Sequence, residues 1–416
     1  MSQALTIKKP VHFILNPLRD FFNDSRAGGI LLILCTIASL IISNTSSLQS
    51  GYIAFWYKSM PVSILHLPEN PLTWINDVMM AFFFFFVGME IKRELTIGEL
   101  SSVKKSLLPI LAALGGMVCP AIIFWLFNGT NEYHHGWGIP MATDIAFSLA
   151  VLSLLGKKVP VQLKIFLAAL AIIDDLGAVI TIAIFYSSKL NLLYLGGALL
   201  SSFTVIGLNK LKVKATILYL IPAIFIWYCL FNSGIHATIA GVVMAFSMPL
   251  DKLAKVEHLL HKPVNFIIMP LFALANTAII LPSSFGGIYT STISFGIICG
   301  LMIGKPIGIF LFSFISSKIG IATMPANSTY KQLLGIGMLG GIGFTMSIFT
   351  SSLAYIQPEL LVISKVAIIT GSVVSSVLGY IYLSRLKPAT AVAHPLGEYQ
   401  PHYQNSERIE QSIAMG

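Results

Sequence analysis

Charged side chains are scarce in this sequence of 416 residues. Asp, Glu, Lys and Arg together make up 10% of it, whereas 56% of it is hydrophobic. A soluble domain of this length needs far more charged and polar side chains to cover its surface, so the composition excludes that class. The chain is expected to lie in a lipid bilayer.

Cysteine is also scarce. The four cysteines lie in apolar runs without C-x-x-C spacing, so we expect packing residues there and neither disulfides nor cysteine metal sites. No basic stripe is interleaved with aromatic residues, and no nucleic-acid partner is therefore expected. Residues 1–26 lack the apolar core and cleavage site of a signal peptide, and they are interpreted as a cytoplasmic N-terminal segment.

Long apolar runs recur along almost the whole chain, each near the roughly 20 residues with which an α-helix crosses a hydrocarbon core. They predict an all-α membrane protein with twelve transmembrane helices, over residues 27–43, 71–90, 107–127, 137–156, 163–186, 192–208, 215–231, 233–249, 264–281, 293–316, 333–353 and 360–384. Only Asn232 to Gly234 separate the seventh run from the eighth. One long kinked helix is the alternative at that point.

The basic residues favour twelve helices. When the N-terminus is placed in the cytoplasm and the sides alternate, only Lys58 and Lys189 fall outside. This asymmetry follows the positive-inside rule and predicts cytoplasmic termini and an even number of spans. The net charge of +9 then belongs to loops that face anionic headgroups. We expect one membrane domain over 27–385 and a polar cytoplasmic tail over 386–416.

Two of the runs contain helix breakers. Gly136, Gly138 and Pro140 precede Thr143 and Asp144, and a glycine-rich stretch over 335–343 precedes Phe344-Thr345. Both runs are predicted to be interrupted helices, whose unwound backbone is tolerated at membrane depth only beside a polar cavity.

Each interrupted run is the second in a unit of three, 107–186 and 293–384. Equivalent helices are an odd number of places, seven, apart in the order of spans, so the two units have opposite orientations. We therefore predict an inverted-topology repeat with a site near the membrane midplane.

Ionisable side chains inside the runs carry the functional argument. They comprise four carboxylates and two lysines: Asp77, Asp144, Asp174, Asp175, Lys305 and Lys365. A bare carboxylate at the bilayer centre costs several kcal/mol, so protons, a bound cation or water must offset the excess charge. A site that holds either a proton or Na+, and faces one side at a time, exchanges the two ions. Hard oxygen ligands suit such a small cation.

Adjacent aspartates on a helix point about 100° apart, so Asp174 and Asp175 are expected to divide two roles. One faces the unwound segment, where Asp144 and Thr143 complete a cation site, and the other pairs with Lys305. The pattern leaves open which aspartate does which. It also leaves open whether Lys305 is a structural counterion or a proton carrier.

The remaining ionisable residues are given structural roles by preference. Lys365 is near a span end and is expected to extend toward the membrane surface. His236 is interpreted as a hydrogen-bonded packing residue more than as a titrating group. Glu257 and His258 form either a solvated cluster or a pH-sensing surface. Asp77 is the carboxylate least expected to be a ligand.

Seven ordered motifs support a resemblance to a known family. They lie at 74–77, 87–95, 141–147, 171–177, 234–238, 304–308 and 340–347. On these residues, the sequence from about 12 to 385 resembles the NhaA family of sodium/proton antiporters, one of the families on which the inverted-repeat rule itself is based. The resemblance implies a multi-pass protein of the bacterial inner membrane, crossed interrupted helices at 137–156 and 333–353, and a homodimer built partly by a hairpin in the external loop 44–70.

The resemblance also implies residue roles. Na+ or Li+ would bind at Asp175, with Asp174, Asp144 and Thr143 nearby, in exchange for protons. Asp174 would pair with Lys305. Positions associated with pH response are Glu90, His236, Glu257, His258 and Asp77. More than one proton would be exchanged for each sodium ion, which makes transport electrogenic and serves sodium and pH homeostasis. No cofactor and no enzymatic activity are implied.

Three other classes were weighed against exchange. An intramembrane aspartyl protease needs two aspartates on facing helices, whereas the pair here is adjacent. A cation channel favours a symmetric ring of carbonyls or charges, which an inverted repeat does not supply. A proton-coupled cation symporter remains the nearest alternative, because the sign of coupling is a kinetic property that residue patterns do not encode.

Overall fold

The computed structural model describes residues 27–61, 66–187, 190–213, 215, 217–282 and 286–386. The predictions for residues 1–26, for Lys189 and for the tail beyond residue 386 lie outside this part of the chain. Every regular element in the described part is helical. In order these are α2 (Ala27–Asn44), α3 (Gln49–Tyr57), α4 (Pro71–Thr73), η2 (Trp74–Met79), α5 (Met80–Thr96), η3 (Glu99–Ser101), α6 (Val103–Asn128), η4 (His134–Met141), α7 (Ile145–Leu154), η5 (Gly156–Lys158), α8 (Val161–Phe185), α9 (Leu192–Lys210), α10 (Ile217–Ser233), α11 (Ile239–Ser247), α12 (Leu250–Pro263), η6 (Val264–Ile268), α13 (Met269–Asn276), α14 (Gly286–Tyr289), α15 (Thr292–Cys299), η7 (Gly300–Gly304), α16 (Lys305–Lys318), α17 (Tyr330–Gly340), α18 (Phe344–Ala354) and α19 (Pro358–Arg385).

The described residues contain nine helical segments long and apolar enough to cross a membrane, and the bent pair of α17 and α18 makes a tenth. The all-α membrane class predicted from composition is therefore confirmed. Two of the twelve predicted spans are shorter than expected. The run 215–231 forms α10, which has 17 residues, and the run 233–249 forms α11, which has nine. These two helices are separate, since α10 ends at Ser233 and α11 begins at Ile239.

The interval 250–263, interpreted from sequence as a loop, is helical instead. α12 continues through the π-helical turn η6 into α13, so one long helix runs from Leu250 to Asn276. Leu253 is buried on one side of α12, whereas Asp251 and Lys255 are exposed. An amphipathic segment of this kind is stable as a helix because one face packs onto the protein while the other stays solvated.

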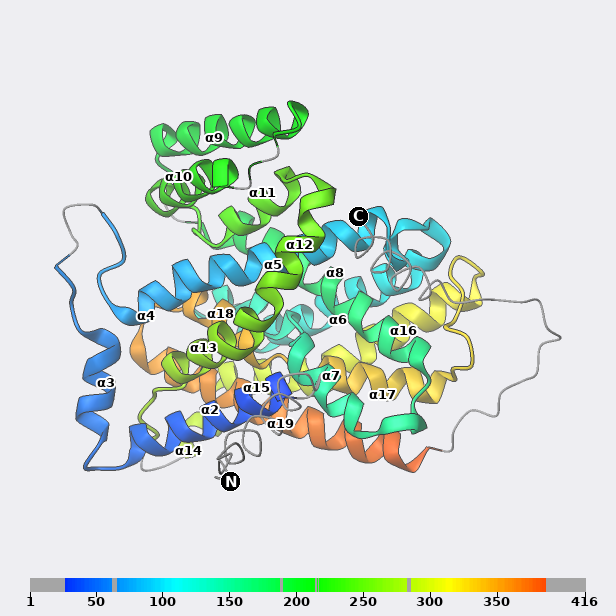
Figure 1. Ribbon diagram of the computed structural model, residues 1–416. Coiled ribbons are helices and arrows are strands. Elements are labelled where there is room, and N and C mark those ends of the chain that lie inside the picture. Colours follow the sequence, from blue (N-terminus) through cyan, green and yellow to red (C-terminus); the bar gives the residue numbers. More distant parts are fainter. Residues whose placement is uncertain are drawn as a thin grey trace, which may run out of the picture.

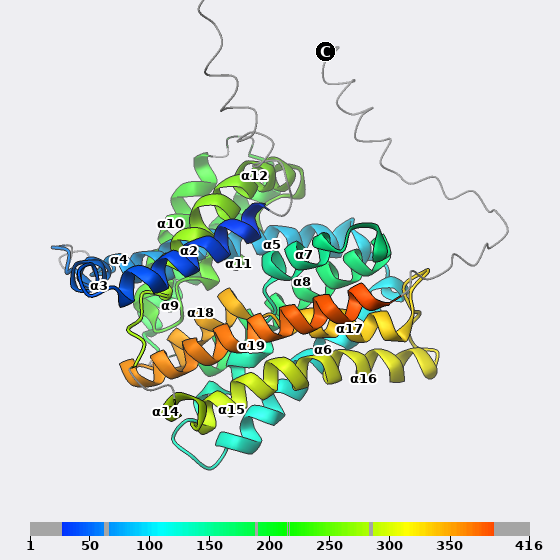
Figure 2. The ribbon, with the colours of Figure 1, turned by 90° about the horizontal axis from the view of Figure 1, so that it is seen from below.

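Figures 1 and 2 show how the helices are layered. α9 and α10 lie side by side at one edge, and α11 sits between them and α5. This edge has its own small apolar cluster, with Val205, Ile226 and Met244 among its buried members. The other helices share one large apolar core that extends from α2 to α19. The polar groups discussed below are buried in the part of this core formed by α6, α8 and α15 to α19.

α6 and α16 approach each other closely through a pair of glycines. A Cβ atom on Gly115 would overlap the carbonyl oxygen of Gly308, and one on Gly308 would overlap that of Gly115. Glycine lets two membrane helices pack backbone to backbone, which any side chain at these positions would prevent. The contact fixes the position of α16, whose first residue is Lys305.

The chain leaves the helical conformation at 142–144, between η4 and α7, and at 341–343, between α17 and α18. The second pair of helices is bent by 46°. The first interruption follows the glycines and proline from which it was predicted, and the second forms the end of its glycine-rich stretch. The interruptions also contact each other, because the Asp144 amide donates to the Ile342 carbonyl at 2.7 Å. The unwound segments of two spans that are far apart in sequence therefore lie side by side.

Candidate functional site

α8 carries Asp174 and Asp175 just beyond its midpoint. The residues around them on this helix are almost all apolar, so the helix is buried on most sides. Both carboxylates are buried as a result. Asp174 is 0% exposed and Asp175 is 2% exposed. Charged groups are almost never this buried unless something pairs with them. The neighbouring elements supply part of that pairing.

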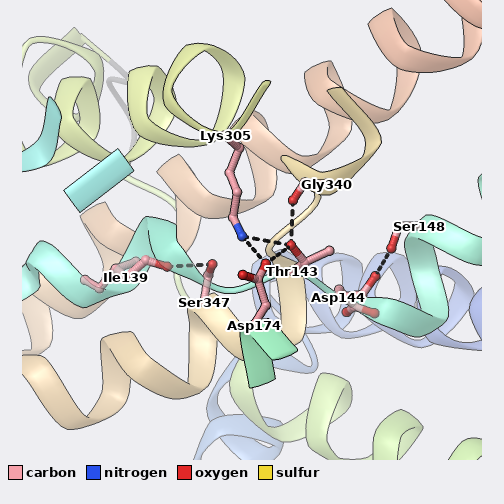
Figure 3. A network of polar contacts seen from close by, with 8 residues as sticks. All are labelled: Ile139, Thr143, Asp144, Ser148, Asp174, Lys305, Gly340 and Ser347. Atoms are coloured by element: carbon pink, nitrogen blue, oxygen red, sulfur yellow. Dashed lines mark hydrogen bonds and ion pairs between the residues drawn. The ribbon is translucent and has the colours of Figure 1, made fainter. Parts of the chain in front are cut away.

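Lys305 is positioned by a local irregularity of its helix. The π-helical turn η7 ends at Gly304 and is followed by Lys305-Pro306. Proline lacks an N–H group and collides with the carbonyl four residues earlier, so the helix widens just before it. The Lys305 side chain is fully buried, and its ammonium group forms an ion pair with Asp174 Oδ2. The same Nζ atom donates to Thr143 Oγ1 at 2.9 Å (Figure 3).

Thr143 links the first interruption to three other elements. Its Oγ1 lies 2.6 Å from Asp174 Oδ2 and 2.9 Å from the carbonyl oxygen of Gly340, and it accepts from Lys305. A hydroxyl group has one hydrogen to donate, so it serves the carboxylate or the carbonyl at any moment. The two acceptors come from α8 and α17 (Figure 3).

Asp144 caps two half-helices at once. Its Oδ1 accepts the amide of Phe147 in α7 at 2.9 Å, and its Oδ2 accepts the amide and the hydroxyl of Thr345 in α18 at 3.1 and 2.5 Å. Both amides lie in the first turn of their helices, where the helix dipole is positive. The carboxylate therefore offsets two positive helix ends and has partners on both oxygens.

The two aspartates of α8 differ from Asp144 in this respect. Asp174 Oδ1 and Asp175 Oδ1 are buried, and neither has a hydrogen-bond partner among the described residues. Asp175 also lies close enough to Asp174, Asp144 and Glu90 for their negative charges to repel. Buried polar atoms are almost always satisfied, so these two oxygens need a proton or a ligand.

No group of three or more His, Cys, Asp or Glu side chains in the described ranges is arranged to hold a metal ion. The oxygens available beside the α8 aspartates are instead of mixed type. They include the Thr143 hydroxyl and the backbone carbonyls at the two interruptions, such as that of Gly340. Carboxylate, hydroxyl and carbonyl oxygens are all ligands that hard cations accept.

The residues predicted for pH response do not join the hydrogen-bonded cluster. Glu257 Oε1 lies 2.8 Å from Arg93 Nη1, where α12 crosses the end of α5, and Arg93 also contacts Glu94 at 3.2 Å. His258 is exposed on α12, and Glu90 is partly buried on α5. They share the neighbourhood of α5 and α12.

Three further predicted residues lie apart from one another. His236 Nε2 contacts the carbonyl of Tyr186 at 2.9 Å, which agrees with a hydrogen-bonded packing role. Asp77 lies on η2, where its backbone carbonyl accepts from Trp227 Nε1 at 3.0 Å. Lys365 is only 5% exposed, so it is buried within the protein and does not extend to the surface as expected. It has no hydrogen-bond or ion-pair partner among the described residues.

The sequence interpretation missed the contribution of α18. Thr345 supplies two of the three donors to the Asp144 carboxylate, and Ser347 donates to the carbonyl of Ile139 at 2.7 Å. A usable signal was present, because hydroxyl residues directly follow the second glycine-rich stretch just as Thr143 follows the first.

The fold and the site define a multi-pass α-helical membrane protein with ionisable groups buried inside its bundle. A family model described as Na+/H+ antiporter 1 matches residues 19–383. The chain belongs to this family, which confirms the resemblance carried by the seven motifs.

Curated relatives cover most of the chain. Na(+)/H(+) antiporter NhaA 2 of Flavobacterium johnsoniae is 50% identical over 372 residues, which span 88% of this chain and 91% of that protein. Na(+)/H(+) antiporter NhaA of Cytophaga hutchinsonii is 47% identical over 371 residues, spanning 88% and 94%. Na(+)/H(+) antiporter NhaA of Escherichia coli O1:K1 / APEC is 43% identical over 384 residues, spanning 89% and 99%. These relatives are named as antiporters and not as enzymes.

Proposed function

We propose that this chain is a secondary active transporter that exchanges Na+ or Li+ for H+ across the bacterial inner membrane. The family match and the names of the relatives support this activity. The transported ions are its only small-molecule partners, and it needs no cofactor and catalyses no covalent reaction.

The observation that carries the proposal is the pair of buried carboxylate oxygens without a partner, Asp174 Oδ1 and Asp175 Oδ1. Protons on these groups satisfy the site in one state. Na+ held by Asp175, with Asp174, Asp144 and Thr143 beside it, satisfies the site in the other state. Because both occupants need the same carboxylates, each displaces the other.

Lys305 balances one of the negative charges through its ion pair with Asp174. When Na+ binds, the site gains one positive charge, and release of protons from two groups more than compensates for it. Exchange of more than one proton for each Na+ moves net charge across the membrane, which makes the transport electrogenic.

The finer architecture belongs to the same proposal: twelve spans, cytoplasmic termini, and inverted repeats over about 107–186 and 293–384. The order of elements supports the repeat, since each unit has its interruption in the second span. So does the contact of Gly115 with Gly308, in which each glycine faces the carbonyl of the other. Reciprocal contacts are what equivalent positions form about a two-fold axis.

Regulation and assembly are further parts of the proposal. The Glu257–Arg93 pair, with Glu90 and His258 on the same two helices, supports a pH-responsive cluster outside the hydrogen-bonded site, and Glu90 is near enough for its charge to act on Asp175. His236 and Asp77 are proposed to belong to the response. The loop 44–70 is proposed to form the homodimer. Within it, the Met60 amide donates to the Glu69 carbonyl at 2.7 Å, which brings the two ends of a possible hairpin together.

The test uses inside-out membrane vesicles that are acidified by respiration and followed with a pH-sensitive dye. We expect NaCl and LiCl to release the proton gradient, and choline chloride to have no effect. Asp175→Asn should abolish the response. Asp251→Asn, at an exposed position of α12, should keep it and serves as the matched control.

Different outcomes separate the candidate functions. Loss of the gradient in the parent and in Asp251→Asn, but not in Asp175→Asn, supports exchange through the buried carboxylate. If folded parent protein gives no cation-dependent response across roughly pH 6.5 to 9, where tuned carboxylates and histidines titrate, the exchange proposal is wrong. A proton-coupled symporter or a cation channel then becomes the better explanation.

A further inference from the structure

Tyr186, the residue that follows α8, contacts two other segments of the protein through its polar groups. Its hydroxyl donates to the His135 carbonyl at 2.7 Å and accepts from the Gly138 amide at 3.1 Å. Its backbone carbonyl lies 2.9 Å from His236 Nε2. The phenol thus uses its one hydrogen and an acceptor site on the same segment, η4. Tyr186 joins α8 to η4 and to the turn between α10 and α11.

The packing around these hydrogen bonds is specific. A Cβ atom on Gly138 would lie 2.7 Å from the Tyr186 hydroxyl oxygen, which is too close for any residue except glycine. Beside it, the Trp137 ring meets the Phe185 ring edge to face, with centroids 5.0 Å apart. Residues of η4 and of the end of α8 therefore pack closely against each other at this contact.

The contact matters because η4 is attached to α8 at a second point. Two residues beyond the other end of η4, Thr143 Oγ1 lies 2.6 Å from Asp174 Oδ2. Asp174 and Tyr186 are separated by twelve residues of helix, or about 18 Å at 1.5 Å per residue. Ser347 of α18 holds the Ile139 carbonyl between these two points, but without the Tyr186 hydroxyl the His135–Gly138 part of η4 loses its hydrogen bonds to the end of α8.

We propose that Tyr186 is a positioning residue for ion exchange. Its hydroxyl holds η4 against α8, and this keeps Thr143 and Asp144 beside Asp174 and Asp175. The inference rests on the proposed function, to which it adds a residue that does not touch the ion.

Tyr186→Phe removes both hydroxyl hydrogen bonds and keeps the ring. Two neutral hydrogen bonds correspond to roughly a ten-fold shift in the balance between held and released η4. When only a fraction of the molecules has a competent site, the apparent KM for Na+ rises in inverse proportion, and saturating Na+ restores the maximal rate. The rise in KM and the rise in exposure of η4 measured below multiply to this factor of about ten. We expect each to be about three-fold, with a maximal rate within about two-fold of the parent.

The matched control is Tyr52→Phe. The Tyr52 hydroxyl also makes two hydrogen bonds, to Ser39 Oγ at 2.9 Å and to the Leu274 carbonyl at 3.0 Å, but between elements far from η4. Its KM should equal that of the parent. An unchanged KM together with an unchanged exposure of η4, measured as described next, overturns the inference. So does a lower maximal rate with both of these unchanged, because that result reports only a smaller amount of folded protein.

A second measurement does not depend on transport. Ile139 is 0% exposed and follows Gly138, so a single cysteine introduced there reports whether η4 stays in place. The reporter Ile139→Cys is made in a variant without the four native cysteines, and its rate of reaction with a membrane-impermeant thiol reagent is measured in vesicles of both orientations. Tyr186→Phe should raise this rate about three-fold from one side of the membrane, so that the increases in labelling and in KM multiply to about ten-fold, and Tyr52→Phe should raise neither.

The labelling separates two kinds of failure. If the parent shows no Na+-dependent proton release while Tyr186→Phe still accelerates labelling, the proposed function is wrong and the hold of Tyr186 on η4 stands. If the parent exchanges ions but labelling is unchanged, or is equally faster from both sides, the positioning role of Tyr186 is wrong.

Discussion

Asp144 divides its two carboxylate oxygens between the N-terminal turns of α7 and α18, and Thr345 provides most of the second contact. The hydroxyl of Thr345 donates to a charged acceptor in a buried place, where such a bond is stronger than a neutral one. The residue thus contributes to stability and also fixes one α18 terminus relative to the ion site.

Replacing Thr345 tests this contribution. Thr345→Val keeps the shape and the backbone amide but removes the hydroxyl, so it should destabilise the purified protein by about 1–3 kcal/mol. Thr350→Val, which loses only a bond to its own helix at Met346, should change stability little. Thermal unfolding in detergent measures both; equal midpoints for the two variants would contradict the assigned role.

Lys305 and Asp174 form a second prediction at the residue scale. Lys305→Met leaves the Asp174 charge buried without its cation, which should cost about 3–5 kcal/mol. Adding Asp174→Asn removes that charge, so the double variant should recover most of the lost stability. Additive losses in a double-mutant cycle would show that the two side chains do not interact as the ion pair requires.

Single residues also show the limit of the sequence interpretation. The count of buried charges indicated that Lys305 pairs with one of two aspartates, but the choice of Asp174 depends on the rotation of α8, which packing against distant helices sets. The contact between Thr345 and Asp144 joins positions 201 residues apart. It exists only because two interruptions meet, and no local pattern specifies that meeting.

At the scale of elements, the close contact of α6 with α16 requires glycine on both helices, at positions 115 and 308. Gly115→Ala places a Cβ onto the Gly308 carbonyl, and forcing the two helices apart should cost about 1–3 kcal/mol or more. Gly196→Ala, on α9 with open space around it, should be neutral or slightly stabilising. Unfolding midpoints of the two variants should therefore shift in different directions, and a stable Gly115→Ala protein would count against the packing described.

Helix positions were predicted better than helix ends. Apolar runs located the spans because they report the thickness of the bilayer core, and glycine and proline located both interruptions. The extension of the 264–281 run back to Leu250 was missed, since α12 is amphipathic and does not read as membrane-embedded. The shortness of α11 was missed for the opposite reason: residues 234–238, with Ile235 and Ala237 among them, were counted with the apolar run but form a turn.

At the scale of the whole molecule, the basic residues predict orientation. A green fluorescent protein fused after Arg385 should fluoresce, because it folds in the cytoplasm, and alkaline phosphatase inserted after Lys58 should be active on the outer side. A matched phosphatase insertion after Ser102, between α5 and α6 on the side assigned to the cytoplasm, should be inactive. Activity at both insertions would contradict the proposed topology.

The unpartnered oxygens of Asp174 and Asp175 also bear on leakage. In an alternating-access cycle, ions run downhill without coupling whenever the carrier reorients with nothing bound. An empty, ionised pair buried in the bundle is several kcal/mol less stable than a loaded one, so this slip occurs seldom. Under the proposed exchange, the carboxylate oxygens that bind the transported ion therefore also limit uncoupled ion leakage, and no separate gate is needed for that purpose.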